Sequence, residues 1–137
     1  MPNLGIYSPQ PAVNDDYLGR LTHATAGTRA GVLVFHDVTT SGSTTADFDV
    51  VVLDKFEVID VIVRKDAAGA GNTITVKNTA TAITDAIVFA TDKAVTRAGT
   101  IDTASNVIAA GGTLRVTATR AAGTVAGLVT VVGIIRP

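Results

Sequence analysis

Branching at Cβ sets the strongest limit on the fold of this chain. Valine, isoleucine and threonine dominate its 137 residues, whereas helix formers are scarce: Glu57 is the single glutamate, and there are four lysines. Two heavy substituents on Cβ stiffen a side chain against a helical backbone but suit the pleated surface of a strand. Thirteen glycines supply turns between short strands. The composition therefore predicts an all-β fold.

Strand-like segments alternate with polar or glycine-rich connections. The clearest are residues 31–38, 47–53, 57–64, 73–77, 113–119 and 125–135. Residues 96–101 form a weaker candidate, and residues 81–90 fit either a short strand or a single helical turn. The glycine-rich segment 65–72 resembles a hairpin connection between neighbouring strands. About eight strands at this spacing predict a jelly roll or a related antiparallel β-sandwich.

The first thirty residues differ from the rest of the chain. Residues 1–14 hold every proline except Pro137. A proline cannot donate to a β-ladder and keeps its predecessor extended. The segment is also more apolar than a typical solvated tail, although a disordered tail is the alternative. We therefore expect an extended N-terminal arm over residues 1–30 and one β-sandwich domain over residues 31–137.

Composition and charge argue against several classes of protein. The chain has no cysteine, so it has no disulfides and no thiolate chemistry. Its formal net charge is −1 without a basic stripe, which argues against nucleic-acid binding. Residues 1–10 lack the pattern of a signal peptide, and no apolar run is long enough for a membrane helix. We expect neither a nucleic-acid nor a membrane partner.

Few residues could carry catalysis. The histidines are His23 and His36, and His36 and its neighbour Asp37 should point to opposite faces of a strand. None of the four serines lies in a Gly-x-Ser-x-Gly frame. A small jelly-roll enzyme of the cupin type would need a cluster of histidines around a metal, and two histidines make that hypothesis poor. We expect no enzymatic activity, no cofactor and no small-molecule substrate.

The acidic and aromatic residues have structural interpretations. Asp47 and Asp49 share a strand face and Asp15 and Asp16 are adjacent, but calcium needs six or more oxygens, usually from a dedicated loop. We interpret them as solvated residues and expect no metal site. Sugar-binding surfaces usually use exposed aromatic side chains. The phenylalanines are more simply interpreted as core residues: Phe35, Phe48, Phe56 and Phe89.

The last strand segment, residues 125–135, is apolar on both faces, although a strand with one face in water should alternate. Leu128, Val132 and Ile134 share one face, and Val129, Val131 and Ile135 share the other. Residues 57–64 show a milder form of this pattern. There, simple alternation places Ile59, Val61 and Val63 inward and places Val58 and Ile62 outward. We expect the arm or a neighbouring subunit to cover these outer faces.

The predicted interface follows from the apolar arm and the two-sided last strand. Its residues are Leu4, Ile6, Tyr7, Pro9, Pro11, Val13, Tyr17, Leu18, Val132 and Ile134. The sequence leaves open whether these residues contact a capsid or another copy of this chain. It also leaves open whether the chain forms a trimer or a dimer.

Several segments together resemble a family of phage virion proteins. They are VIDVIVR at 58–64, TITVKN at 73–78, AITDAI at 82–87, RAGTID at 97–102 and AAGGTLRVT at 109–117. Residues 57–137 resemble the jelly-roll decoration, or cement, proteins of tailed bacteriophages. The resemblance rests on texture and strand order, and the family offers no catalytic residues to carry over.

The resemblance implies a structural role. A decoration protein lies on the capsid exterior of the virion, forms dimers or trimers, and bridges subunits of the major capsid protein. The alternative is a carbohydrate-binding β-sandwich module of a phage fibre or a secreted protein. Binding to a specific glycan, or an aromatic-lined groove, would favour that alternative.

Overall fold

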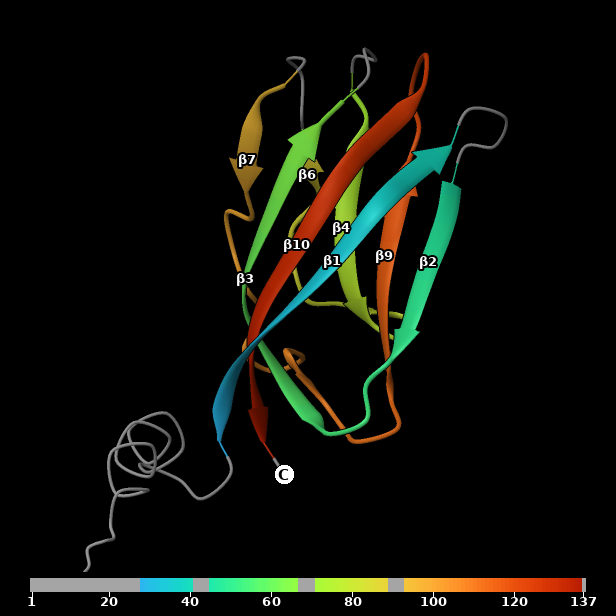
Figure 1. Cartoon of the computed structure of the whole chain (residues 1–137). Coiled ribbons are helices and arrows are strands. Elements are labelled where there is room, and N and C mark those ends of the chain that lie inside the picture. Colours follow the sequence, from blue (N-terminus) through green and yellow to red (C-terminus); the bar gives the residue numbers. More distant parts are fainter. Residues whose placement is uncertain (1–27, 41–44, 67–70, 89–92, 137) are drawn as a thin grey trace, which may run out of the picture.

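The computed structural model describes residues 28–40, 45–66, 71–88 and 93–136, and all regular secondary structure in these ranges is β-strand (Figure 1). Val/Ile/Thr-rich segments form the long strands, as their Cβ branching predicts. The ten strands are β1 (Arg29–Thr40), β2 (Thr45–Val51), β3 (Lys55–Lys65), β4 (Thr73–Asn78), β5 (Thr81–Ala82), β6 (Ile87–Val88), β7 (Val95–Arg97), β8 (Val107–Ile108), β9 (Thr113–Thr119) and β10 (Val125–Arg136).

The strands form two antiparallel sheets, and their pairing is nested. One sheet has the order β1-β10-β3-β7, with β8 also paired to β3; the other has the order β2-β9-β4-β5, with β6 also paired to β4. Thus the first strand pairs with the last, the second with the next to last, and so on inward. This is the order of an eight-stranded jelly roll in which two positions are each split into two short strands. The predicted fold class is confirmed, and the arm lies mostly outside the described residues.

The prediction for the connection 65–72 was wrong. The segment is not a hairpin link between neighbours, because β3 and β4 belong to different sheets. The glycine-rich segment instead carries the chain from one sheet to the other, with Gly71 at a φ of +74°. Of the two alternatives for residues 81–90, the described part, 81–88, follows the strand alternative: β5 and β6 flank a single bridge between Thr84 and Ile101.

The core lies between the two sheets and contains seventeen buried apolar side chains. The predicted alternation of β4 and β9 is confirmed, since Ile74, Val76 and Leu114 are fully buried. Each such side chain contributes about 1.5–3 kcal/mol through burial. Phe56 is buried in this core, and Phe35 and Phe48 are partly buried against it, as expected. Phe89 lies outside the described residues.

A β-bulge in β3 overturns the predicted facing of two residues. Val132 lies opposite Asp60 but Gly133 lies opposite Val58, so Ile59 has no partner in β10. An extra residue in one strand reverses the inward and outward order beyond it. Val58 is therefore fully buried and Ile59 is 47 % exposed, the reverse of simple alternation.

Asn106 holds the bulge in place. The backbone N–H of Val58 donates to the Asn106 carbonyl at 2.8 Å. The Asn106 side-chain amide donates in turn to the Val58 carbonyl at 2.9 Å. Asn106 is itself buried, so these bonds are shielded from water. The loop before β8 thus fixes the point at which β3 changes its facing.

Two paired glycines make room for the Phe56 ring within the β1-β10-β3 part of one sheet. Gly31 of β1 lies opposite Gly133 of β10. A Cβ on Gly133 would lie 2.5 Å from the Glu57 carbonyl oxygen and 2.5 Å from the Phe56 ring. The Phe56 ring occupies the space that a side chain would need, which is why glycine is required there.

Candidate interaction surface

The outward side of the β1-β10-β3-β7 sheet carries a patch that we call the outer apolar face. It combines residues of three adjacent strands that point away from the core. Its members are Val32, Val34, Ile59, Ile62, Leu128, Val132 and Ile134. Val32 is 57 % exposed, Ile59 is 47 % exposed and Val34 is 43 % exposed. The β10 members and Ile62 are half-buried.

Strand register places the members of this patch on one face. Val32 lies opposite Val132, which in turn lies opposite Asp60. Two positions along, Val34 and Ile62 lie on either side of Thr130. Side chains directly opposite one another have Cβ atoms about 4.5–5.5 Å apart, so the side chains of Val32 and Val132 touch. The patch therefore spans three strands, with Thr130 and Asp60 between some of its apolar members.

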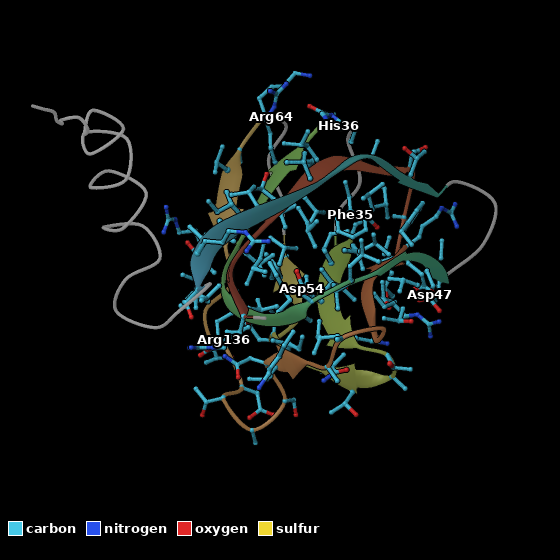
Figure 2. The ribbon with its side chains drawn as sticks, turned by 60° about the horizontal axis from the view of Figure 1, so that its bottom comes forward. Phe35, His36, Asp47, Asp54, Arg64 and Arg136 are labelled. Atoms are coloured by element: carbon cyan, nitrogen blue, oxygen red, sulfur yellow. The ribbon has the colours of Figure 1, made fainter. Side chains whose placement is uncertain are left out.

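Ion pairs border the outer apolar face. Arg97 contacts Asp60 at 2.7 Å beside the centre of the patch. At the two ends of the β3–β10 pairing, Arg64 contacts Asp66 at 3.0 Å and Arg136 contacts Glu57 at 2.6 Å. Figure 2 shows Arg64 and Arg136 on opposite sides of the molecule. Pairing neutralises these charges locally and leaves the patch without a strong field of either sign. Such an apolar patch with a polar rim is typical of a protein–protein interface.

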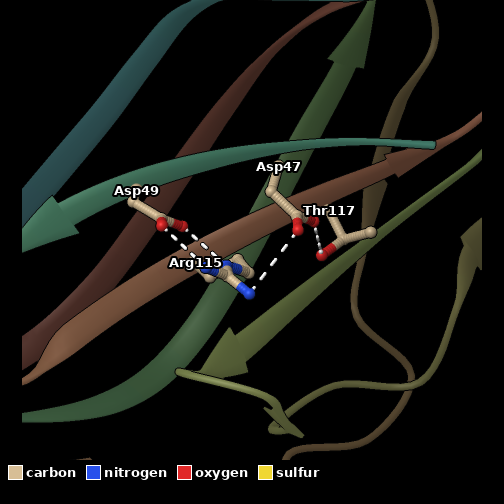
Figure 3. Close-up of polar contacts among 4 residues, drawn as sticks. All are labelled: Asp47, Asp49, Arg115 and Thr117. Atoms are coloured by element: carbon tan, nitrogen blue, oxygen red, sulfur yellow. Dashed lines mark hydrogen bonds and ion pairs between the residues drawn. The ribbon is translucent and has the colours of Figure 1, made fainter. Parts of the chain in front are cut away.

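The outward side of the β2-β9-β4 sheet is polar. Thr45, Asp47 and Asp49 of β2 face outward, opposite Thr119, Thr117 and Arg115 of β9. Arg115 donates two hydrogen bonds, of 2.7 and 2.8 Å, to the Asp49 carboxylate and lies 3.5 Å from Asp47 (Figure 3). Thr117 donates to Asp47 at 2.7 Å. The two aspartates are therefore held by protein groups, and are not simply solvated as the sequence suggested.

This network shifts the ionisation of its members. The hydrogen bond from Arg115 holds the pKa of the Asp49 carboxyl below its usual value, although partial desolvation acts in the opposite direction. The same hydrogen bond raises the pKa of Arg115. Both groups stay charged at neutral pH. The arrangement is that of a structural ion pair, since Arg115 and Thr117 of the same sheet hydrogen-bond the two carboxylates.

Chemistry-bearing residues do not converge elsewhere in the described part of the chain. His36 is exposed on β1, and His23 lies outside the described ranges. Within those ranges, no group of three or more histidines and carboxylates could hold a metal ion. The described phenylalanines are buried in the core or packed against it, so none of them forms an exposed aromatic surface. No helix of the described ranges is long and apolar enough to cross a membrane.

The predicted interface residues divide into two sets. Leu4, Ile6, Tyr7, Pro9, Pro11, Val13, Tyr17 and Leu18 lie outside the described residues. Val132 and Ile134 lie on the outer apolar face, where the structure brings them beside Val32. The sequence interpretation missed the contributions of Val32, Val34 and Ile59. The unbroken apolar run at 32–35 could have indicated the first two, but only the bulge explains Ile59.

Comparisons with known proteins give little. No family model and no curated protein matches the chain. Among solved structures, it is similar to the "Crystal structure of infectious bursal disease virus VP2 subviral particle", with 10 % sequence identity and a TM-score of 0.31. The match covers 98 % of this chain and 45 % of that viral chain. The chain thus spans less than half the length of the VP2 chain, and no functional argument rests on this similarity.

Proposed function

We propose that this chain is a structural virion protein that binds the outside of a phage capsid and bridges major-capsid subunits. The observation that carries the proposal is the outer apolar face, which spans β1, β10 and β3 and leaves Val32, Val34 and Ile59 exposed in the described chain. Burying such a face against a partner stabilises the contact by roughly 25 cal/mol per Å² of apolar surface. The resemblance of residues 57–137 to decoration proteins is the reason for proposing a capsid partner.

The pairing of carboxylates with arginines on both sheets supports a binding role without catalysis. Carboxylates of both sheets are held by arginines: Asp49 by Arg115, Asp60 by Arg97 and Glu57 by Arg136. A catalytic carboxylate would instead face a cavity that admits substrate. We therefore propose that the chain is no enzyme and has no nucleic-acid, membrane or small-molecule partner.

The mechanism is thermodynamic linkage. A protein that binds the assembled shell and not its dissociated subunits adds its binding free energy to the stability of the shell. At a free concentration one hundred times its dissociation constant, each occupied site adds about 2.7 kcal/mol. Association of the chain into a trimer, or a dimer, would increase its affinity for the shell, because several copies would contact the shell at the same time.

Co-sedimentation with empty shells tests the proposal. The shells are assembled from a tailed-phage major capsid protein, the partner proposed here. Val34→Asp places a charge on the outer apolar face at a residue outside the lining of the pocket between β1 and β2, and should reduce shell occupancy at least tenfold. Val88→Asp is the matched control, because Val88 is 52 % exposed on the other sheet and Val34 is 43 % exposed. Equal occupancy for both variants and the unmodified chain would refute the proposed face.

The arm is tested separately. Deleting residues 1–10 should leave the melting temperature unchanged and weaken binding to shells, because the apolar, proline-containing segment adds contact area beyond the domain. Unchanged occupancy would show that this segment makes no capsid contact. Light scattering on the free chain measures the proposed self-association.

A further inference from the structure

A second apolar surface lies in a groove between the edge strands of the two sheets. In Figure 1, β1 and β2 lie close at one end and diverge towards the end where β3 begins. The groove has a volume of about 360 Å³. It is lined by Val32, Leu33, Val50, Val51, Val52, Leu53, Asp54, Phe56 and Ile135. Asp54 is the single charged residue of this lining.

The groove is incompletely covered by the described chain. Leu53 is 87 % exposed and Val51 is 57 % exposed at its rim, whereas Phe56 at its base is buried. Both flanking strands are sheet edges: in the described ranges β1 pairs with β10 alone and β2 pairs with β9 alone. An edge strand offers unpaired backbone groups to a further extended segment. The site therefore presents both apolar side chains and backbone partners.

We propose that the occupant of this groove is the chain's own segment 13–21. The path of β1 supports this choice, because the strand begins beside the groove. Arg29, its first residue, lies 3.6 Å from Asp54 of the groove lining. A Cβ on Gly31 would lie 2.6 Å from the Ile135 side chain, which also lines the groove. The preceding residues are thus tethered at the mouth of the site.

Length and tethering favour this occupant over a separate molecule. Leu21 and Arg29 are eight positions apart in the sequence, a distance that an extended chain spans up to about 27 Å. A short tether of this kind gives an effective concentration in the millimolar range. A second copy of the chain would have to reach a comparable concentration in solution to compete.

The composition of the segment fits the groove. Val13, Tyr17, Leu18 and Leu21 supply apolar side chains. Residues 12–28 contain no proline, so every backbone N–H in this stretch can donate to a strand edge. Pro2, Pro9 and Pro11 all precede it. The proline-containing residues 1–11 thereby stay available for contacts beyond the domain, which makes this inference independent of capsid binding.

The chain provides its own reporter for a test. Tyr7 and Tyr17 are its two tyrosines and it has no tryptophan, so tyrosine fluorescence reports on the arm alone. In a Tyr7→Phe background the signal comes from Tyr17. Acrylamide quenching should be weak in this parent and should increase two- to threefold in Leu53→Asp, which charges the rim of the groove. Because Leu53 is largely exposed, this variant should retain the melting temperature of the fold.

Controls separate the possible outcomes. Val88→Asp, on β6 and outside the groove lining, should leave quenching unchanged, and Leu53→Ser repeats the rim test without adding a charge. Nuclear Overhauser contacts between the Tyr17 ring and the methyl groups of Val51 and Leu53 would support docking directly. Strong quenching in the parent, or no response to either Leu53 variant, would overturn the proposal. So would protection of Tyr17 that grows with protein concentration together with the mass by light scattering, since that result assigns the groove to a second copy.

Discussion

Truncating two adjacent residues of β3 tests the bulge that shapes the outer apolar face. Val58 is fully buried and Ile59 is 47 % exposed. Val58→Ala removes about two methylene equivalents from the core, worth roughly 1.6 kcal/mol in transfer free energy. The cavity left behind raises the expected loss to about 2–3 kcal/mol. Ile59→Ala removes more atoms, but from a partly solvated position, and should cost less than about 1 kcal/mol.

Urea denaturation followed by circular dichroism measures both losses. The midpoint should fall clearly for Val58→Ala and slightly for Ile59→Ala, with the slope m unchanged in both variants. Thermal unfolding gives a parallel measure, since 1 kcal/mol corresponds to about 3–4 °C for a domain of this size. Simple alternation along β3 predicts the opposite order. A larger loss for Ile59→Ala would therefore refute the bulge and, with it, the placement of Ile59 on the outer apolar face.

Three further substitutions examine other parts of the fold. Gly133→Ala should destabilise the domain by about 1–3 kcal/mol in urea denaturation, because its Cβ would meet the Glu57 carbonyl and the Phe56 ring at 2.5 Å. Asn106→Ala should cost about 1–3 kcal/mol in the same assay, since it leaves the buried Val58 carbonyl without the Asn106 amide. Arg115→Gln should raise the pKa of Asp49 towards its ordinary value in an NMR titration. In the unmodified chain the pKa of Asp49 is depressed, so its stabilising contribution is present above the ordinary pKa of about 3.9 and is lost as the pH falls through the depressed value. That acid-dependent loss should shrink in Arg115→Gln.

The fold class could be predicted because it depends on local properties of the sequence. Cβ branching identified the long strands, and period-2 alternation gave the correct buried faces of β4 and β9. The same alternation failed in β3, where the facing depends on Asn106, 48 positions away from Val58. The segment 65–72 failed for a related reason. A glycine-rich turn indicates only that the chain reverses direction. It does not indicate that β3 pairs with β10 in one sheet while β4 joins the other sheet.

The candidate site was only partly predictable, since it is formed by register. Val132 and Ile134 could be selected because the last strand is apolar on both faces. Val32 joins them through the β1–β10 pairing, which links opposite ends of the described chain. Likewise, Asp47 and Asp49 looked solvated in the sequence because Arg115 reaches them only through the β2–β9 pairing.

The two sheets satisfy their outward groups in different ways, and this difference is the basis for assigning the interface. On the β2-β9-β4 sheet, Arg115 neutralises Asp49 and approaches Asp47, so the charged groups already have partners within the chain. On the other sheet, valine and isoleucine side chains remain exposed to water beside the Asp60–Arg97 ion pair. Desolvating paired charges gains little free energy, whereas desolvating an apolar surface gains free energy in proportion to its area. A partner therefore binds more favourably to the outer apolar face across β1, β10 and β3 than to the polar sheet opposite.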